Sequence, residues 1–270
     1  MQNKQSNLEP LIKWVKNYFK GNDCGKAVIG ISGGKDSTIA AGVLARALGA
    51  DRIIAVMMPC GEQSDIKDSY EVCDCLNIPN ENRFVINIGT AFTDIKNEIV
   101  CGGDITLMDN RTDLVFQNPV INTNLPARLR MCTLYAVAAM YPNSRVVNTS
   151  NYSERYIGYS TKWGDGVGDF SLFGLLTVRD VLAIGDELGL PRHLVHKTPS
   201  DGMSGKSDEE KIGFSYADLD DYILRNFDKQ LSMDTINKIE KMHNANKHKI
   251  DPMPTFIPKE VPQPVFEGGR

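Results

Sequence analysis

One short stretch constrains the fold of this chain more than any other: an apolar run that stops at Ser32-Gly33-Gly34 and gives way at once to a helical pattern. The apolar run covers residues 26–31, and over residues 39–48 the apolar positions recur at offsets of three and four. The sequence therefore predicts a buried strand, a turn of small residues and a helix. A strand that leads directly into a helix is the repeating unit of a parallel α/β sheet.

The turn itself has the composition of a phosphate-binding site. The first N–H groups of a helix lack partners within the helix and carry the positive end of its dipole, and glycines let a phosphate approach them closely. Ser32 and Ser37 add hydroxyl donors, whereas the carboxylate of Asp36 repels a phosphate unless a cation lies between them. The pattern therefore predicts Mg²⁺ beside a phosphorylated ligand. The alternative is an ordinary strand–turn–helix whose glycines serve packing alone.

Composition limits the possible partners. The 270 residues carry a formal net charge of −4 and no long run of Lys or Arg, so we expect no nucleic-acid partner. None of the six cysteines forms a C-x-x-C pair, which favours reduced thiols and a cytoplasmic location over zinc or disulfides. No stretch is apolar over the roughly 18 residues that a membrane span needs, so no membrane association is expected.

Strands and helices alternate along the chain. Strands are expected at 26–31, 52–58, 83–88 and 145–149, and helices at 7–20, 65–76, 122–141, 177–188, 216–227 and 233–247. This order predicts an α/β fold: a doubly wound, mostly parallel sheet with helices on both faces and a ligand crevice at the carboxyl ends of the strands. We expect one domain over residues 1–270, with a Pro-rich, irregular tail from about 252 to 270. In the helix at 122–141, Asn124 is the expected N-cap and Pro126 is expected in the first turn.

The motif Ser32-Gly33-Gly34-x-Asp36-Ser37 resembles the pyrophosphate loop of the N-type ATP pyrophosphatases, and it lacks the spacing of a Walker A loop or a dinucleotide fingerprint. The resemblance implies the adenine nucleotide alpha hydrolase-like fold. It also implies that ATP is cleaved between its α and β phosphates, that AMP is transferred to an oxygen of the substrate, and that a nitrogen or sulfur nucleophile then displaces it. The implied ATP contacts are Gly30, Ile31, Ser32, Gly33, Gly34, Lys35, Asp36 and Ser37.

Further motifs narrow the resemblance to the ammonia-dependent NAD synthetases. In chain order they are Asn124-x-x-Ala127-Arg128-x-Arg130, residues 148–154, 158–169, 197–200, 205–210 and 213–216, and His248-Lys249. The resemblance runs from about residue 7 to about residue 255. It implies a ligase that activates the nicotinate carboxylate of deamido-NAD with ATP and amidates it with ammonia, giving NAD, AMP and pyrophosphate. It also implies a homodimer with residues 124–141 near the interface. Free ammonia is the expected donor, unless a separate glutaminase subunit delivers it.

The same resemblance implies roles for single residues. Asp36 and Glu154 would hold Mg²⁺, and the hydroxyls of Thr149 and Ser207 would contact ATP. The implied contacts to deamido-NAD are Arg128, Lys162, Asp169, His248 and Lys249. Asp165, between two glycines, would attract ammonium and accept the proton that the nucleophile loses; the alternative is a plain turn. The expected catalytic residues are therefore Asp165, Asp36 and Lys162.

The chain departs from the family pattern at two positions. Where relatives usually carry a Lys that contacts ATP, this chain has Val178, and Arg179 lies about 100° further around the helix. Ser207 stands where Thr is usual. Residues 199–210 are expected to form a lid that excludes water from the acyl-adenylate, or else a simple connector. Two other functions stay open: another ATP-pyrophosphatase enzyme such as an amidotransferase or a tRNA-thiolation enzyme, and a non-catalytic ATP-binding sensor.

Overall fold

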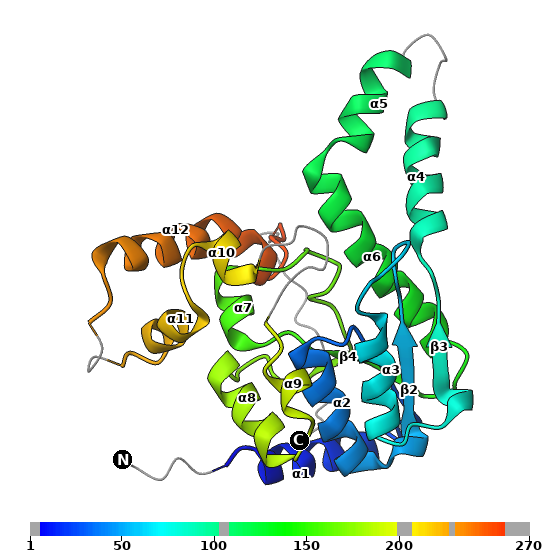
Figure 1. Ribbon diagram of the computed structural model, residues 1–270, viewed down its shortest axis with the longest axis vertical. Coiled ribbons are helices and arrows are strands. Elements are labelled where there is room, and N and C mark those ends of the chain that lie inside the picture. The colour runs from blue at the N-terminus through cyan, green and yellow to red at the C-terminus, as the bar shows by residue number, and fades with distance from the viewer. Residues whose placement is uncertain (1–5, 103–107, 199–206, 227–229, 257–270) are drawn as a thin grey trace.

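A five-stranded, all-parallel sheet lies at the centre of the computed structural model (Figure 1). The structure describes residues 6–102, 108–198, 207–226 and 230–256. The strands follow one another across the sheet in the order β3–β2–β1–β4–β5. Their bounds are β1 (Ala27–Gly30), β2 (Ile53–Met57), β3 (Arg83–Val85), β4 (Arg145–Asn148) and β5 (Phe170–Ser171). This confirms the expected α/β class, and it adds β5, which at two residues is too short to leave a periodic signal.

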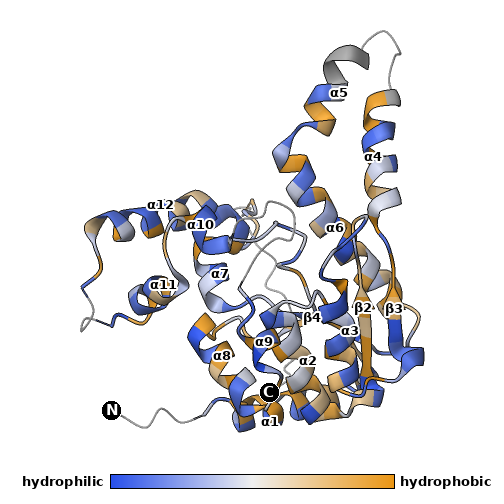
Figure 2. Cartoon of the chain, viewed as in Figure 1, coloured by the Kyte–Doolittle hydropathy of each residue, from blue (hydrophilic) through white to orange (hydrophobic). Residues whose placement is uncertain are grey.

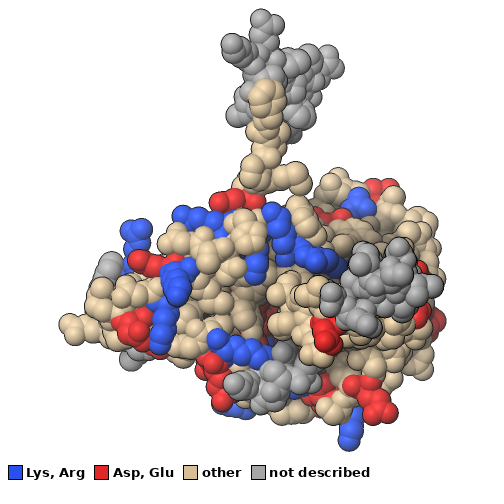
Figure 3. All heavy atoms as spheres, turned by 90° about the horizontal axis from the view of Figure 1, so that it is seen from above, with Lys and Arg blue, Asp and Glu red and all other residues tan. Residues whose placement is uncertain are grey.

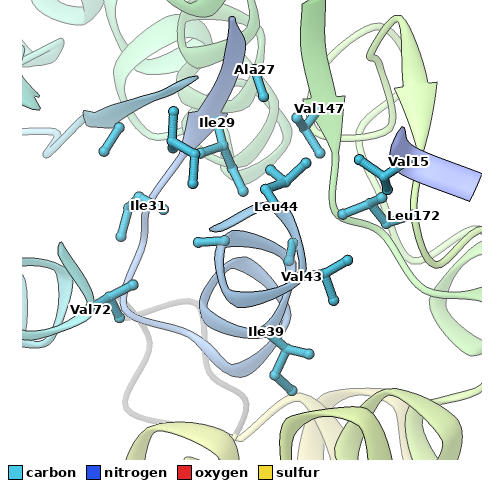
Figure 4. Close-up of a cluster of buried hydrophobic side chains, with 14 of the residues drawn as sticks. Val15, Ala27, Ile29, Ile31, Ile39, Val43, Leu44, Val72, Val147 and Leu172 are labelled. Carbon is cyan, nitrogen blue, oxygen red and sulfur yellow. The ribbon is translucent and has the colours of Figure 1, made fainter. Parts of the chain in front are cut away.

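Helices cover both faces of the sheet, as expected. Because successive side chains of a strand point to opposite faces, Ala27 and Ile29 belong to one buried cluster and Val28 to another. Figure 4 shows the first cluster, in which Ile29 of β1 lies near Leu44 of the following helix. Its helices are α1 (Leu8–Gly21), α2 (Lys35–Leu48), α3 (Ile66–Cys75), α8 (Val178–Glu187) and α9 (Arg192–Val195). The opposite face packs against α6 (Pro119–Ala138).

The hydropathy of each element matches this layering. Figure 2 shows strands β2 and β3 as mainly apolar, whereas the helices around the sheet carry both apolar and polar residues. Every residue of β2 is buried, as expected for a strand with neighbours on both sides and helices on both faces. Burial of these apolar side chains is the main favourable contribution to folding, roughly 25 cal/mol for each Å² removed from water.

The strand order places the ligand crevice. From β1 the chain builds outward through β2 and β3, and it then returns to the other side of β1 to add β4 and β5. In an open α/β sheet, ligands bind outside the carboxyl ends of the strands where this reversal occurs. The reversal falls between β1 and β4. The segments that leave these two strands, residues 31–34 and 149–151, therefore face the crevice.

Two expectations about helix α6 are wrong. The helix begins at Pro119, and its N-cap is Asn118, whose side chain accepts hydrogen bonds from Val120 N at 2.9 Å and Ile121 N at 3.3 Å. Pro126 lies inside the helix and not in its first turn. Pro119 directly follows Asn118, Pro126 lies two residues after Asn124, and the earlier pair starts the helix.

Two helices that were not expected precede α6. They are α4 (Gly89–Cys101) and α5 (Met108–Phe116), and they extend with the beginning of α6 away from the sheet as an arm (Figure 1). Several apolar side chains on this arm are exposed, among them Ile99, Leu114 and Val120. A helix without a continuous apolar face leaves little pattern in a sequence, which explains why both were missed.

The C-terminal part of the chain forms its own small cluster. Helices α7 (Tyr152–Ile157), α10 (Asp208–Ile212), α11 (Tyr216–Ile223) and α12 (Met233–Ile250) meet around apolar residues that include Tyr216, Leu219 and Ile239. Helix α11 ends before the expected boundary at 227. Of the expected loop at 199–210, residues 199–206 lie outside the described residues, and Ser207 caps α10 and is followed by helix. Residues 252–256 form no helix or strand, and the rest of the expected tail is not described.

Two further expectations concern membranes and thiols. Within the four described ranges, no helix combines the length and apolarity that a membrane span requires. Five cysteines are free thiols: Cys24, Cys60, Cys73, Cys75 and Cys132. Burial raises the pKa of the Cys73 thiol to about 11, so this side chain is an unreactive part of the core.

Candidate active site

The turn after β1 is held by its own hydroxyl groups. Ser32 Oγ lies 3.1 Å from Ser37 Oγ and accepts a hydrogen bond from Gly34 N at 3.2 Å. Gly33 has φ +74°, and a Cβ on it would lie 2.7 Å from Cβ of Asp68, so only glycine fits. Gly34 is the N-cap of α2 and gives the helix no side-chain cap. The first turn of α2 therefore presents its backbone N–H groups to the crevice, as an anion site requires.

The two residues before the turn fix its position. Gly30 ends β1, and the N–H of Ile31 donates to Val56 O at 2.9 Å, which continues the pairing with β2. The Ile31 side chain is buried in the core, so it cannot contact a nucleotide. Both residues can contribute to ATP binding only through their backbone and by placing the turn.

Two carboxylates meet beside the turn, and a lysine lies between them. Lys35 Nζ donates to Asp36 Oδ2 at 2.6 Å and lies 3.9 Å from Glu154 Oε1. Asn151 joins the same group: its side-chain amide donates to Asp36 Oδ1 at 3.2 Å, and its backbone N–H donates to Glu154 Oε2 at 3.4 Å. The loop after β4 thus brings Glu154 to the loop after β1, where the expected metal ligands come together.

Burial and charge act strongly on this group. Loss of hydration and the neighbouring charge of Asp36 raise the pKa of Glu154 to about 8, against the attraction of Lys35. Burial opposes the charge of Lys35, but attraction to Asp36 and Glu154 outweighs it and raises the pKa of the ammonium. Two acids this close hold their charge only with a cation between them.

The residues present fit Mg²⁺ held jointly with nucleotide phosphates. The side chains of Asp36 and Glu154 are each 18% exposed, so both reach the crevice. No group of three or more His, Cys, Asp or Glu side chains able to hold a metal ion occurs in the described part of the chain. Mg²⁺ commonly binds through one or two carboxylates together with substrate phosphates and water. The buried hydroxyl of Tyr216, without a hydrogen-bond partner among the described residues, is consistent with a missing polar ligand.

A second polar group lies across the crevice, in the loop after α7. The Asp165 carboxylate accepts a hydrogen bond from Thr161 N at 2.6 Å, and Asn148 of β4 donates to Asp165 O at 3.0 Å. Although Asp165 keeps an exposed surface, loss of hydration around the carboxyl raises its pKa against the hydrogen bonds and the charges of Lys249 and Arg130. A carboxylate with a raised pKa is a better proton acceptor at neutral pH.

This loop is built by contacts from distant elements. Thr161 Oγ1 donates to Asn124 Oδ1 at 2.8 Å, so Asn124 holds the loop from within α6. Arg128 Nε donates to Lys162 O at 3.2 Å, and Lys162 Nζ donates to His248 O. Between Lys162 and Gly164, Trp163 has φ +62°, a backbone conformation that is unfavourable for a bulky residue and that often occurs at functional sites.

The end of α12 supplies the remaining expected contacts. Lys249 Nζ donates to Gly158 O at 2.9 Å, and its partial burial lowers its pKa. His248 contributes its backbone oxygen to Lys162, whereas its exposed ring lies 3.2 Å from Ala245 O through Nδ1. The structure therefore brings Arg128, Lys162, His248 and Lys249 into one polar network around the loop that carries Asp165.

Two of the three remaining expected site residues have other local roles. Asp169 lies directly before β5, where its carboxylate accepts hydrogen bonds from Val146 N at 2.7 Å and Tyr135 Oη at 3.2 Å. It is therefore not brought to the carboxylate pair within one chain. The Ser207 hydroxyl caps α10 and donates to Glu210 at 2.9 Å. Thr149 directly follows β4 and is partly exposed at the crevice.

Val178 and Arg179, where relatives usually carry an ATP-contacting lysine, both make contacts within the chain. Val178 is buried at the start of α8, and its backbone N–H donates to Ser153 Oγ at 3.1 Å. The guanidinium of Arg179 donates to Asp221 at 2.7 Å. Val178 thus supplies no charge, and the charge of Arg179 is paired with Asp221.

Asn151 and Tyr216 contribute to the site without having been predicted. Asn151 also caps α7: its side chain accepts from Glu154 N at 3.0 Å. The Asn-x-x-Glu spacing of this capping box is visible in the sequence and could have indicated it. The ring of Tyr216 lies 5.5 Å from Lys35 Nζ, a contact between distant segments that leaves no local signal.

Figure 3 shows Lys and Arg side chains on the face seen from above, with Asp and Glu side chains among them. A separate cavity of about 730 Å³ lies beside α4 and α6, where Cys60, Asn87, Lys96 and Asn122 line part of it. Neither Asp36 nor Glu154 lines this cavity. We therefore place the ATP chemistry at these two carboxylates and not in the cavity.

Comparison with known proteins agrees with this geometry. Residues 7–253 match the family described as NAD synthase. An NH₃-dependent NAD⁺ synthetase of Syntrophomonas wolfei is 32% identical over 266 residues, which cover 96% of this chain and 99% of that protein. The structure of NMN synthetase from Francisella tularensis has a TM-score of 0.78 at 30% identity, covering 92% of this chain and 96% of that one. NAD⁺ synthetase from Burkholderia pseudomallei has a TM-score of 0.68 at 26% identity, with coverage of 90% and 88%. The chain therefore belongs to the NAD synthase family of carbon–nitrogen ligases, as its motifs predict.

Proposed function

We propose that this chain activates the nicotinate carboxylate of deamido-NAD with ATP and amidates the product with ammonia, releasing AMP, pyrophosphate and NAD. The observation that carries the proposal is the meeting of Asp36 and Glu154 beside the open N-terminus of α2, at the strand-order reversal of the sheet. A carboxylate is a poor electrophile, and adenylation gives it a good leaving group. That step gathers triphosphate and carboxylate charge in one place, which requires metal and protein cations.

The turn after β1 would bind the phosphates of ATP, and the two carboxylates would bind the metal ion. The backbone N–H groups of the turn and the hydroxyls of Ser32 and Ser37 would hold the pyrophosphate that leaves. Mg²⁺, held by Asp36 and Glu154 together with the phosphates, would neutralise the charge that develops on them. Thr149 at the end of β4 and Ser207 at the start of α10 supply hydroxyls on the two sides of this space.

The loop of Asp165 would serve the second half-reaction. An anionic pocket attracts ammonium, and a carboxylate with a raised pKa can accept the proton that ammonium must lose before it attacks. Lys162, tied to the end of α12, would orient the activated acid through its charge. Arg128 of α6 joins this network through its hydrogen bond to Lys162 O. Its planar guanidinium suits a phosphate or a carboxylate.

A homodimer would complete the substrate site. Arg128 and Tyr135 are seven residues apart on α6, which places them on the same side of the helix about 10 Å apart. Tyr135 holds Asp169, so a ligand along this side could contact both Arg128 and Asp169. A second copy packed on α6 would cover that ligand. We also infer a cytoplasmic location, which agrees with the free thiols of the described cysteines.

Isotope transfer tests the reaction directly. Deamido-NAD labelled with ¹⁸O in the nicotinate carboxylate is incubated with the protein, ATP, Mg²⁺ and ammonium, and the products are examined by mass spectrometry. The proposal predicts one ¹⁸O in AMP and none in pyrophosphate. ADP and orthophosphate as products would contradict it. ATP binding without any turnover would favour the sensor reading, and ATP cleavage that does not depend on the acid would favour another pyrophosphatase.

Nicotinate mononucleotide is a second candidate substrate. The specific observation is that the NMN synthetase structure has a higher TM-score than the NAD⁺ synthetase structure, 0.78 against 0.68, at comparable coverage of this chain. The chemistry at the carboxyl group is the same for the two acids, which differ only in the adenylate half. Comparing kcat/KM for the two acids at fixed ATP, Mg²⁺ and ammonium decides between them.

A further inference from the structure

Lys35 holds a positive charge between the two carboxylates that are proposed to bind Mg²⁺. It is the first residue of α2, and only 5% of its side chain is exposed. Its ammonium lies 2.6 Å from Asp36 Oδ2 and 3.9 Å from Glu154 Oε1, and the ring of Tyr216 lies 5.5 Å away. A lysine buried this deeply keeps its charge only because of these two acids.

All four oxygens of the two carboxylates already have a positive or N–H partner. Lys35 faces one oxygen of each acid, and Asn151 donates to the other oxygen of each. Asn151 is fixed, because the same residue caps α7 with its side chain and backbone. Lys35 is different: its charge sits at the end of a flexible four-carbon stem. A metal ion that binds both acids would therefore lie beside the Lys35 ammonium, and the two positive charges would repel each other.

Resting on the proposed function, we propose that Lys35 is an internal counter-ion that competes with Mg²⁺ for Asp36 and Glu154 until a nucleotide binds. In the nucleotide-free chain the ammonium offsets part of the charge of the pair, so Mg²⁺ binds weakly. Phosphates on the turn give the displaced ammonium a new partner, because Lys35 directly follows Gly34 at the open start of α2. Metal and nucleotide then bind together, and Lys35 becomes a phosphate contact.

The first test measures Mg²⁺ binding without nucleotide by calorimetry. Wild type is compared with Lys35→Met and Lys35→Gln at the same pH and ionic strength. Both variants are expected to bind Mg²⁺ at least about tenfold more tightly, because a unit positive charge has been removed from the pair. The matched control is Lys26→Met, since Lys26 lies before β1 and bonds to Asp51 O and Asn82. Unchanged affinity in both Lys35 variants would overturn the inference.

A second measurement concerns nucleotide affinity, which Lys35→Met is expected to lower and not to raise. At saturating Mg²⁺, Lys35→Met is expected to bind a non-hydrolysable ATP analogue about tenfold more weakly, since a charge-assisted contact to phosphate is lost. Lys35→Arg, which keeps the charge, is expected to restore part of this affinity. A purely structural lysine would weaken both ligands together, and that outcome would contradict the proposal.

A double variant tests whether the change in Mg²⁺ affinity arises at Glu154. Lys35→Met/Glu154→Gln is expected to lose the gain in Mg²⁺ affinity that Lys35→Met alone shows. If the double variant keeps the gain, the metal binds elsewhere and the inference fails. These assays contain no acid substrate, so they are independent of turnover. Failure of the proposed function would instead appear as the absence of amide product from wild type with either acid.

Discussion

The turn after β1 and the loop around Asp165 face the same crevice, but they are built differently. The turn is held by contacts between residues two to five apart, such as Ser32 to Gly34 and Ser32 to Ser37. The loop is held by contacts across 34, 86 and 91 positions of the chain, made by Arg128, Lys162 and Lys249. One half of the site is thus a local structure on a buried strand, and the other depends on α6 and α12 being in place.

This difference suggests a division of function. Adenylation needs groups at fixed positions around the triphosphate, and a turn anchored to the central strand provides them. We expect the acid and ammonia to bind at the loop around Asp165, which is held by contacts from α6 and α12. Local unfolding costs least where a segment depends on few, distant contacts. The loop is therefore the half of the site that we expect to order on substrate binding.

The largest expected effect comes from removing the acid of the turn. Asp36→Ala is expected to lower pyrophosphate release by about 10³-fold or more, because the metal loses a ligand and Lys35 loses its closest partner. The measurement is release of pyrophosphate with ATP, Mg²⁺ and deamido-NAD. Asp186→Ala, which removes an exposed acid from α8, is the control and should release pyrophosphate like wild type. Near-normal release by Asp36→Ala would show that the turn does not hold the metal.

The next effect separates the two halves. Asp165→Asn keeps the size of the side chain and its hydrogen bond from Thr161, but it cannot accept a proton. We expect amidation to slow by about 10²-fold while adenylation changes little. Single-turnover measurements of acyl-adenylate formation and of amide product follow the two steps separately. Equal losses in both steps would mean that Asp165 supports the whole site and does not serve ammonia in particular.

The same contrast explains what could be predicted from the sequence. The strand, the turn and the start of α2 were predicted from the residues themselves, because their signals lie within a few positions of each other. Helix α6 was placed too late, because the choice between Asn118 and Asn124 as N-cap depends on where the chain arrives from α5. The alternation that predicts strands cannot show a two-residue strand such as β5.

The meeting of the two acids could not be derived from spacing. Asn151 reaches Asp36 across 115 positions, and only the strand order brings β1 and β4 side by side. The pairing of Asp36 with Glu154 was expected only from the family resemblance. The position of Lys35 between them was not expected, since a lysine in a glycine-rich turn normally indicates a phosphate contact and gives no sign of an ion pair with its own neighbours.

A smaller effect probes the support from α12. Lys162→Met removes the ammonium that binds His248 O and lies over the ring of Trp163. We expect KM for the acid to rise by about tenfold, as for loss of one charge-assisted contact, with KM for ATP nearly unchanged. The control is Lys238→Met, an exposed lysine of α12 that pairs with Asp234 on the same helix. If KM for ATP rises as much as KM for the acid, the two halves of the site are coupled more tightly than their construction suggests.

The last effect is on stability and has a defined sign. In the folded chain, burial and the charge of Asp36 raise the pKa of Glu154 from 4.5 to about 8. Between these values the folded state binds more protons than the unfolded state, so the free energy of unfolding falls as pH rises, by at most about 1.4 kcal/mol per pH unit. Glu154→Gln removes this titration and is expected to flatten the slope, whereas the exposed Glu62→Gln should keep it. Chemical denaturation across this pH range, without Mg²⁺ or nucleotide, measures the slope. If it persists in Glu154→Gln, other groups govern the pH dependence, and the raised pKa of Glu154 is refuted.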